Sequence, residues 1–201
     1  NKGVVVYNGV DFTRLDQIST NNMTQMQSSY KVKLCMVGSF GGGRSHVVIC
    51  KAFQRLKTMG AHCFKNADFY FIGARRISEP QCYDDCVAYC QQYNLDNIHF
   101  LGGRSDVPQL LQQMDGFVYS TVHDTFGIAV VEAMAAGLPV IVNDWIVMKE
   151  ITHDGKWATL FRTEDVEDCA NKIQDLIEHL PERKELAKQI SSVLDGNKVN
   201  S

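Results

Sequence analysis

Short apolar runs alternate with amphipathic stretches along most of the chain. Apolar runs of about five residues, typical of buried strands, fall at residues 4–7, 33–37, 68–72, 97–101, 116–119, 139–142 and 158–161. Helical spacing of apolar residues predicts helices at 46–59, 81–93, 106–114, 126–136, 163–180 and 182–194, the last leading into a polar tail to residue 201. Strands separated by such helices indicate a parallel sheet with helices on both faces, so we expect a doubly wound, Rossmann-like α/β fold.

Residues at the ends of these stretches support the division. Asp106 and Thr163 precede helical stretches and are predicted N-caps, whereas Gly137 follows one and is predicted to end it in the left-handed conformation. Asn8-Gly9 is predicted to form a turn. Ligands of doubly wound sheets bind where strands end and loops enter helices. We therefore expect the ligand-binding residues in the loops that follow the strands.

Composition and charge narrow the class of protein. The chain has 201 residues, is 45% hydrophobic and 21% charged, and carries a net charge of −3. These values favour one globular domain over residues 1–201 and exclude a disordered, collagen-like or coiled-coil chain. With this net charge the protein has no overall positive potential that would attract nucleic acid. An anionic ligand must therefore be bound by a few local groups. We find no signal peptide or membrane span and expect a cytoplasmic protein. Because Asn1 opens directly on a predicted strand, we expect the chain to be part of a longer protein.

The cysteines could form a metal site or pack in the core. There are seven, an odd number scattered through apolar stretches, which favours reduced thiols in the core. Cys82, Cys86 and Cys90 share one face of a predicted helix. Zinc would need a fourth ligand and usually loop-borne cysteine pairs. We therefore favour a buried stripe, and predict no metal site.

A glycine-rich loop, 38–45, joins a predicted strand to a predicted helix. Its spacing is that of a phosphate-binding P-loop, except that Arg44 stands where lysine belongs. The planar guanidinium is a poor replacement for lysine, and no strand ends in the acidic residue that a P-loop nucleotidase needs. No G-x-G-x-x-G follows a strand either. Two interpretations stay open: a tight connection only, or a phosphate site built on Arg44 at a helix N-terminus.

The segment 119–141 is the most informative part of the chain. A strand runs into a loop with Asp124, the backbone turns at Gly127, and the second turn of the following helix carries Glu132. The free N–H groups that open this helix suit a diphosphate, with one carboxylate on either side of it for sugar and ribose hydroxyls. Alternatively, Asp124 is an N-cap and Glu132 a solvated residue. We favour a ligand role for Glu132, because its apolar neighbours predict a buried helix where an unpaired carboxylate is costly. For His123 and Trp145 we favour a loop spacer and packing beneath the loop.

This segment resembles the acidic signature of glycosyltransferase family 4, also called glycosyl transferases group 1. The signature has an acidic residue, seven residues that include Phe-Gly, a second Glu, and then Ala-Met-Ala-x-Gly-x-Pro-Val-Ile. Other pieces match in the same order over nearly the whole chain, at 8–11, 37–44, 52–53, 71–73, 99–102 and 154–155. The resemblance implies the C-terminal, donor-binding half of a GT-B enzyme, with the N-terminal acceptor domain absent and residues 182–201 as a C-terminal helix and tail.

The resemblance also implies roles for individual residues. Asp124 and Glu132 would be the catalytic-site carboxylates, with Glu132 on the ribose and Asp124 on the transferred sugar. The backbone of Phe126, Gly127 and Ile128 would lie at the diphosphate, and Arg44 would neutralise the leaving group. Gly38, Gly73 and Leu101 would complete the donor site at neighbouring strand ends.

The implied activity is that of a retaining, metal-independent hexosyltransferase without a cofactor. It would take a UDP- or GDP-sugar donor and a carbohydrate or lipid-linked acceptor in bacterial cell-surface polysaccharide synthesis, with a peripheral position at the inner face of the membrane left open. The chain alone, without its N-terminal partner domain, would be inactive. A catalytically silent nucleotide-binding module and a GT-B-like epimerase or phosphorylase are the alternatives. Three positions depart from the family: Asp124 replaces the usual Glu, Ser39 a usual basic residue, and 143–147 a frequent Gly-Gly.

Overall fold

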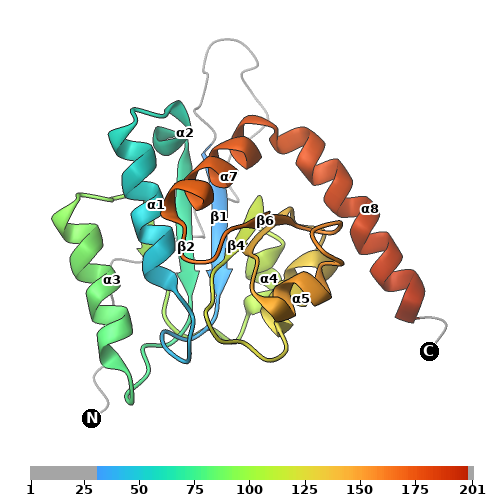
Figure 1. Cartoon of the computed structure of the whole chain (residues 1–201), viewed down its shortest axis with the longest axis horizontal. Helices are drawn as coiled ribbons and strands as arrows, with labels where there is room; N and C mark the ends of the chain where they lie inside the picture. Colours follow the sequence, from blue (N-terminus) through green and yellow to red (C-terminus); the bar gives the residue numbers. More distant parts are fainter. Residues whose placement is uncertain (1–30, 199–201) are drawn as a thin grey trace, which may run out of the picture.

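A parallel six-stranded sheet forms the centre of the domain (Figure 1). The computed structural model describes residues 31–198, so the predicted strand at 4–7, the Asn8-Gly9 turn and the 8–11 motif lie outside it. The strands are β1 (Val32–Val37), β2 (Ala67–Ile72), β3 (Ile98–Phe100), β4 (Gly116–Tyr119), β5 (Val140–Asn143) and β6 (Thr159–Phe161). Their order is β3-β2-β1-β4-β5-β6, and every pairing is parallel. The prediction of a doubly wound α/β fold is confirmed.

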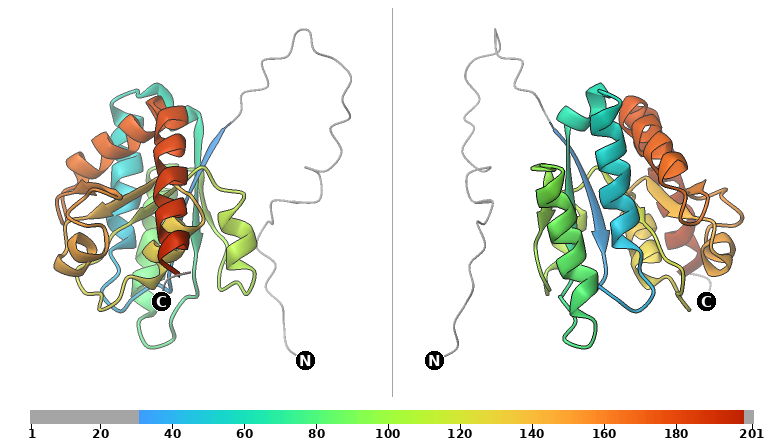
Figure 2. Two further views of the ribbon diagram at one scale, coloured as in Figure 1. Left: turned by 90° about the vertical axis from the view of Figure 1, so that its right-hand side faces the viewer. Right: turned by 60° about the vertical axis from the view of Figure 1, so that its left-hand side comes forward.

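Helices cover both faces of this sheet. They are α1 (His46–Thr58), α2 (His62–Lys65), α3 (Pro80–Gln92), α4 (Val107–Leu111), α5 (Ile128–Ala135), α6 (Ile146–Ile151), α7 (Val166–Glu178) and α8 (Leu180–Lys198). α3, α1 and α7 lie side by side on one face, and α4 lies on the other (Figure 2). α5 packs on β4 and β5 and is flanked by α8, whose Ser191 Oγ donates to the Ala135 carbonyl at 2.7 Å.

One of the predicted caps is wrong. α7 is capped by Asp165 and not by Thr163, because the Asp165 carboxylate accepts the Asp168 N–H at 2.9 Å. Asp106 is the N-cap residue of α4, as predicted, although its carboxylate pairs with Arg104 at 2.7–2.8 Å and accepts no helix N–H. Gly137 follows α5 with φ 75°, as predicted.

The cysteine stripe packs between two helices. Cys86 and Cys90 of α3 are buried, Cys82 is half-buried, and all are free thiols. Hydrogen-bond contacts with Cys86 and Cys90, together with burial, raise the pKa of the Cys50 thiol on α1. Within residues 31–198, no group of three His, Cys, Asp or Glu side chains is arranged to hold a metal ion. The stripe therefore packs α3 against α1.

In the same range no helix has the length and apolar character needed to cross a membrane.

A buried carboxylate joins α8 to the sheet. Asp115, just before β4, accepts the Lys33 N–H at 2.8 Å and forms an ion pair with Lys184 of α8. We expect Asp115→Ala to lower the free energy of unfolding by about 2 kcal/mol, because it strands a buried N–H and an ammonium group. Urea denaturation checks this value. Glu185→Ala removes an exposed carboxylate from the same helix and is the control, and equal stability of the two variants would contradict the role of Asp115.

Candidate functional site

A pocket opens at the point where the strand order reverses. β1 is paired with β2 on one side and with β4 on the other, and the pocket lies where β1 and β4 end. This is where open α/β sheets bind their ligands. It encloses about 290 Å³ and is lined by Val37, Gly38, Arg44, Tyr119, Asp124, Thr125, Phe126, Ile128, Ala129 and Glu132. Six of the predicted site residues, Gly38, Arg44, Asp124, Phe126, Ile128 and Glu132, thus come together.

The glycine loop is clamped to the loop that follows β4. The Val122 N–H and the Thr121 hydroxyl both donate to the Gly43 carbonyl, at 2.8 and 3.1 Å. The Gly42 N–H, which a P-loop would aim at phosphate, instead donates to the Glu79 carboxylate at 2.8 Å. The protein itself therefore accepts one of the N–H groups that a phosphate cradle would use. The loop also offers an anion the Arg44 side chain, which lines the pocket.

Close packing of two glycines sets the floor of the loop. A Cβ added to Gly73, after β2, would lie 1.9 Å from the Gly38 carbonyl oxygen. A Cβ on Gly38, whose φ is 153°, would lie 2.7 Å from the Arg44 Cδ and Nε atoms. Gly73 therefore supports the pocket by packing on Gly38. Because Gly38 has no side chain, the Arg44 side chain can cross the loop next to it.

A buried histidine supports the loop from beneath. The His46 ring stacks on Phe40 with 4.0 Å between ring centroids, and its Nε2 lies 3.2 Å from the Gly38 carbonyl oxygen. Burial lowers the pKa of His46 to about 4. The ring is therefore neutral near pH 7, with the proton on Nε2 donated to Gly38.

Arg44 is held by a tyrosine. Its Nε–H donates to the Tyr119 hydroxyl at 2.9 Å, and that hydroxyl donates to Asp124 Oδ2 at 2.5 Å. Arg44 is half-buried, and no carboxylate of residues 31–194 lies within ion-pair distance of it. A half-buried cation that no carboxylate contacts directly favours an anionic ligand.

Asp124 organises the loop that it sits in. Its Oδ1 accepts the N–H groups of Phe126 and Gly127 at 3.1 and 3.0 Å. Burial alone would raise the pKa of Asp124, but the hydrogen bonds from Tyr119, Gly127 and Phe126 and the nearby Arg44 charge outweigh it and lower the pKa. The carboxylate is thus ionised at neutral pH. The capping alternative is wrong, because Gly127 is the N-cap of α5 and Asp124 instead binds the N–H groups of the loop before it. Its place in the pocket wall leaves Asp124 open to a sugar as well.

The start of α5 carries donors without protein partners. The N–H groups of Phe126 and Gly127 donate to Asp124. The next two, those of Ile128 and Ala129, have no acceptor in the described part of the chain. Both residues line the pocket. Gly127 itself is buried with φ 60°, and a Cβ there would lie 2.5 Å from Ile151 Cδ1. Of the backbone predicted at the diphosphate, Ile128 offers a free donor and Phe126 and Gly127 do not.

Glu132 is exposed, so the prediction of a buried carboxylate was wrong. Ile128 and Val131 beside it are also exposed, at 65% and 40%, because this face of α5 borders the pocket instead of the core. No hydrogen bond or ion pair to the Glu132 side chain is found within residues 31–194. Its place in the pocket wall, and not burial, is what favours a ligand role.

Besides Gly127, four candidate residues do not line the pocket. Leu101 follows β3 at the same edge of the sheet, and its N–H donates to the Phe71 carbonyl at 2.9 Å. His123 is exposed, and its backbone abuts Gly43, as expected of a spacer. Trp145 packs against the core. Gly73 acts through Gly38, as described above.

Some residues of the site were not predicted. The chief one is Tyr119, which looks like any core aromatic at the end of a strand. Arg76 lies beside the glycine loop but outside the pocket, where its guanidinium pairs with Glu79 at 3.2 Å. Asn143, in the segment that departs from the family, is buried and bonds both the N–H and the carbonyl of Thr121. It thereby holds the ends of β4 and β5 together.

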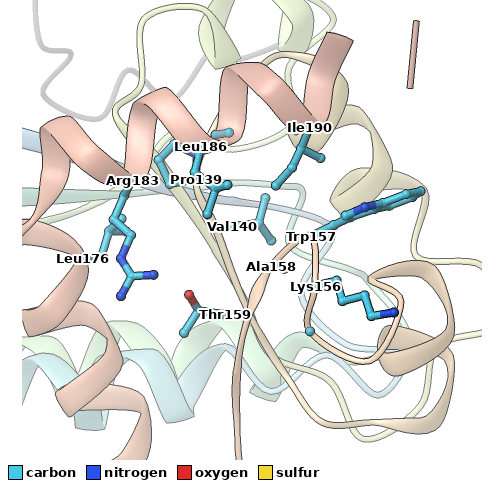
Figure 3. A pocket seen from close by; sticks show the side chains of 12 residues that line it. Pro139, Val140, Lys156, Trp157, Ala158, Thr159, Leu176, Arg183, Leu186 and Ile190 are labelled. Atoms are coloured by element: carbon cyan, nitrogen blue, oxygen red, sulfur yellow. The ribbon is translucent and has the colours of Figure 1, made fainter. Parts of the chain in front are cut away.

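A second cavity lies at the opposite edge of the sheet, where β5 and β6 begin (Figure 3). It encloses about 80 Å³. Leu186 and Ile190 of α8 form one side, and Trp157 and Lys156 another (Figure 3). None of the predicted site residues lines it, so it carries none of the chemistry described above.

The sequence comparison establishes the family. The model for glycosyl transferases group 1 matches residues 22–193, so the chain belongs to that family. The chain is 34% identical over 125 residues to N,N′-diacetylbacillosaminyl-diphospho-undecaprenol alpha-1,3-N-acetylgalactosaminyltransferase of Campylobacter jejuni, a match that covers 61% of this chain and 31% of that protein.

Solved structures agree on the fold. Anabaena HepE in complex with UDP and glucose superimposes with a TM-score of 0.74 at 19% identity, over 82% of this chain and 43% of that one. The C-terminal domain of a glycosyl transferase group 1 protein from Francisella tularensis superimposes with a TM-score of 0.72 at 19% identity, over 82% of this chain and 85% of that one. The domain therefore has the Rossmann-like fold of one half of a GT-B architecture. It spans less than half the length of the Campylobacter and Anabaena proteins.

Proposed function

We propose that this domain binds the nucleotide-diphosphate sugar donor of a retaining glycosyltransferase. The observation that carries the proposal is Arg44, a half-buried cation that no carboxylate of the described residues contacts directly, in a pocket that also offers two free helix N–H groups. A diphosphate satisfies both features, since helix N-termini and arginine forks are recurrent phosphate ligands. The Anabaena structure with UDP supports the choice of a nucleotide ligand.

The remaining groups of the pocket then have roles. Glu132, without a protein partner, accepts the ribose hydroxyls of the nucleotide. Asp124, ionised and fixed at both oxygens, faces the transferred sugar. As the bond to the donor breaks, negative charge grows on the departing diphosphate, and Arg44 with the Ile128 and Ala129 N–H groups stabilises it. These donors do the work that a metal ion would otherwise do, so we propose a metal-independent reaction without a cofactor.

The donor domain alone does not complete the reaction. We propose that residues 1–201 form one domain, which a separate N-terminal domain supplies with a carbohydrate or lipid-linked acceptor. The name of the Campylobacter relative, a diphospho-undecaprenol glycosyltransferase, supports a lipid-linked acceptor in cell-surface polysaccharide synthesis. The competing proposal, a nucleotide-binding module without catalysis, is separated from this one by assaying sugar transfer with the longer protein.

Calorimetry on the 201-residue chain tests the binding step. UDP and GDP are titrated in EDTA, and 2′-deoxy-UDP reports the contact to the ribose. We expect Glu132→Gln to lower UDP affinity about 10- to 100-fold, the effect of losing a hydrogen bond to a charged group, and to abolish the preference for UDP over 2′-deoxy-UDP.

Glu182→Gln, an exposed carboxylate on α8, is the control and is expected to bind as the unmodified chain does. The assignment fails if neither nucleotide binds at millimolar concentration, or if Glu132→Gln leaves both affinities unchanged.

A further inference from the structure

The hydroxyl of Tyr119 stands between the two charged groups of the pocket. It accepts the Arg44 Nε–H at 2.9 Å and donates to Asp124 Oδ2 at 2.5 Å. The direction of this chain is fixed by chemistry, since a guanidinium only donates and an ionised carboxylate only accepts. A hydroxyl does both, so it can bridge the two groups without changing the charge of either.

The bridge replaces a direct ion pair. Arg44 and Asp124 each lie within 3 Å of the same oxygen, yet no Arg44–Asp124 contact of 4 Å or less occurs. Opposite charges this close attract strongly in a partly desolvated pocket. The tyrosine oxygen occupies the space in which the two would meet.

The tyrosine is rigid enough to keep them apart. Its side chain is buried with 1% exposure, and its ring stacks on Phe117 with 6.1 Å between centroids. β4 is paired on both sides, and Tyr119 itself lies in register with Val142 of β5. Asp124 is restrained as well, because its Oδ1 is bound to two backbone N–H groups. Arg44 is the flexible member of the three.

We propose that Tyr119 is a positioning residue that holds Arg44 away from Asp124 and so keeps the guanidinium available to the donor diphosphate. With Nε committed to Tyr119, the two terminal nitrogens form the fork that a phosphate takes. Without the hydroxyl, Arg44 would pair with Asp124, and the diphosphate would have to compete with a carboxylate of the protein. The inference rests on the proposed function and adds to it how the cation is kept free.

A double-mutant cycle on UDP affinity tests the inference. We expect Tyr119→Phe to weaken UDP binding about tenfold, a typical effect of disturbing one charge-assisted contact. In the Asp124→Asn background the amide cannot neutralise Arg44, so adding Tyr119→Phe is expected to change affinity less than about twofold. A loss below twofold for Tyr119→Phe alone would overturn the proposal. So would a tenfold loss that persists beside Asp124→Asn, because the hydroxyl would then act by itself.

Two controls separate positioning from folding. Tyr70→Phe removes the hydroxyl of a buried tyrosine from β2 and is expected to leave UDP affinity unchanged. In the unmodified chain, we expect the ¹⁵N resonance of Arg44 Nε–H to show that this group stays hydrogen-bonded with and without UDP. Disappearance of that hydrogen bond when UDP binds would contradict a fixed bridge, whether or not the variants fold.

The same measurements separate failure of the Tyr119 role from failure of the proposed function. If the unmodified chain does not bind UDP or GDP, the donor-site assignment fails. If it binds and depends on Arg44, but Tyr119→Phe has no effect, only the role of Tyr119 fails.

Discussion

Arg44→Gln is expected to lower the affinity of the chain for UDP by about 100-fold, while affinity for uridine, which lacks phosphate, stays within twofold. The loss is large because Arg44 is the half-buried cation of the pocket and forms no direct ion pair with a carboxylate among residues 31–194. Arg44→Lys keeps the charge but loses both the planar fork and the bond to Tyr119, so we expect an intermediate loss. Calorimetry with both ligands measures each value.

The salt dependence of binding gives an independent reading of the same contact. UDP affinity of the unmodified chain should fall as salt is raised, and the fall should be shallower for Arg44→Gln. Arg55→Gln is the control: Arg55 lies on α1 and pairs with Glu167 on the surface, so its loss should not affect UDP. UDP binding by Arg44→Gln within threefold of the unmodified chain would refute the role of Arg44.

Gly73→Ala is expected to lower the free energy of unfolding by about 3 kcal/mol and to abolish UDP binding. The added Cβ would lie 1.9 Å from the Gly38 carbonyl oxygen, a backbone atom with no rotamer to escape into. Either β2 or the glycine loop must move, and the loop carries Arg44. A stability change and a binding change should therefore appear together.

Gly103→Ala is a matched control at the same edge of the sheet. A Cβ there would meet the Ala74 Cβ at 3.4 Å, an ordinary contact. We expect its free energy of unfolding, measured by urea denaturation, to stay within about 0.5 kcal/mol of the unmodified chain. If Gly73→Ala matches Gly103→Ala in stability and in UDP affinity, the packing of Gly73 on Gly38 does not support the site.

The fold could be predicted from the sequence because each strand is a compact apolar run and each long helix has a clear period. The periodic signal is lost where elements are short. α2 has only four residues, too few for a period, and it was not predicted. The cap of α7 was misplaced by two residues because Thr163 and Asp165 are both good N-caps, and only the bond from the Asp168 N–H decides between them.

Only part of the pocket could be predicted from the sequence. Its place followed from the rule that strand ends bind ligands, and Arg44 and Glu132 followed from residue type and order. The exposure of Glu132 did not, because Ile128 and Val131 look like core residues in sequence but are exposed in the structure. Tyr119 could not have been found at all, since its role depends on a contact 75 residues away along the chain.

The central claim is that a nucleoside diphosphate binds where β1 and β4 end, and backbone ¹H–¹⁵N spectra of the chain titrated with UDP test it most directly. We expect the largest shifts at Gly38, Ile128, Ala129 and Glu132, with Leu186 and Trp157 at the far edge of the sheet unchanged. Shifts that gather around Leu186 and Trp157, or no shifts at millimolar UDP, would contradict it.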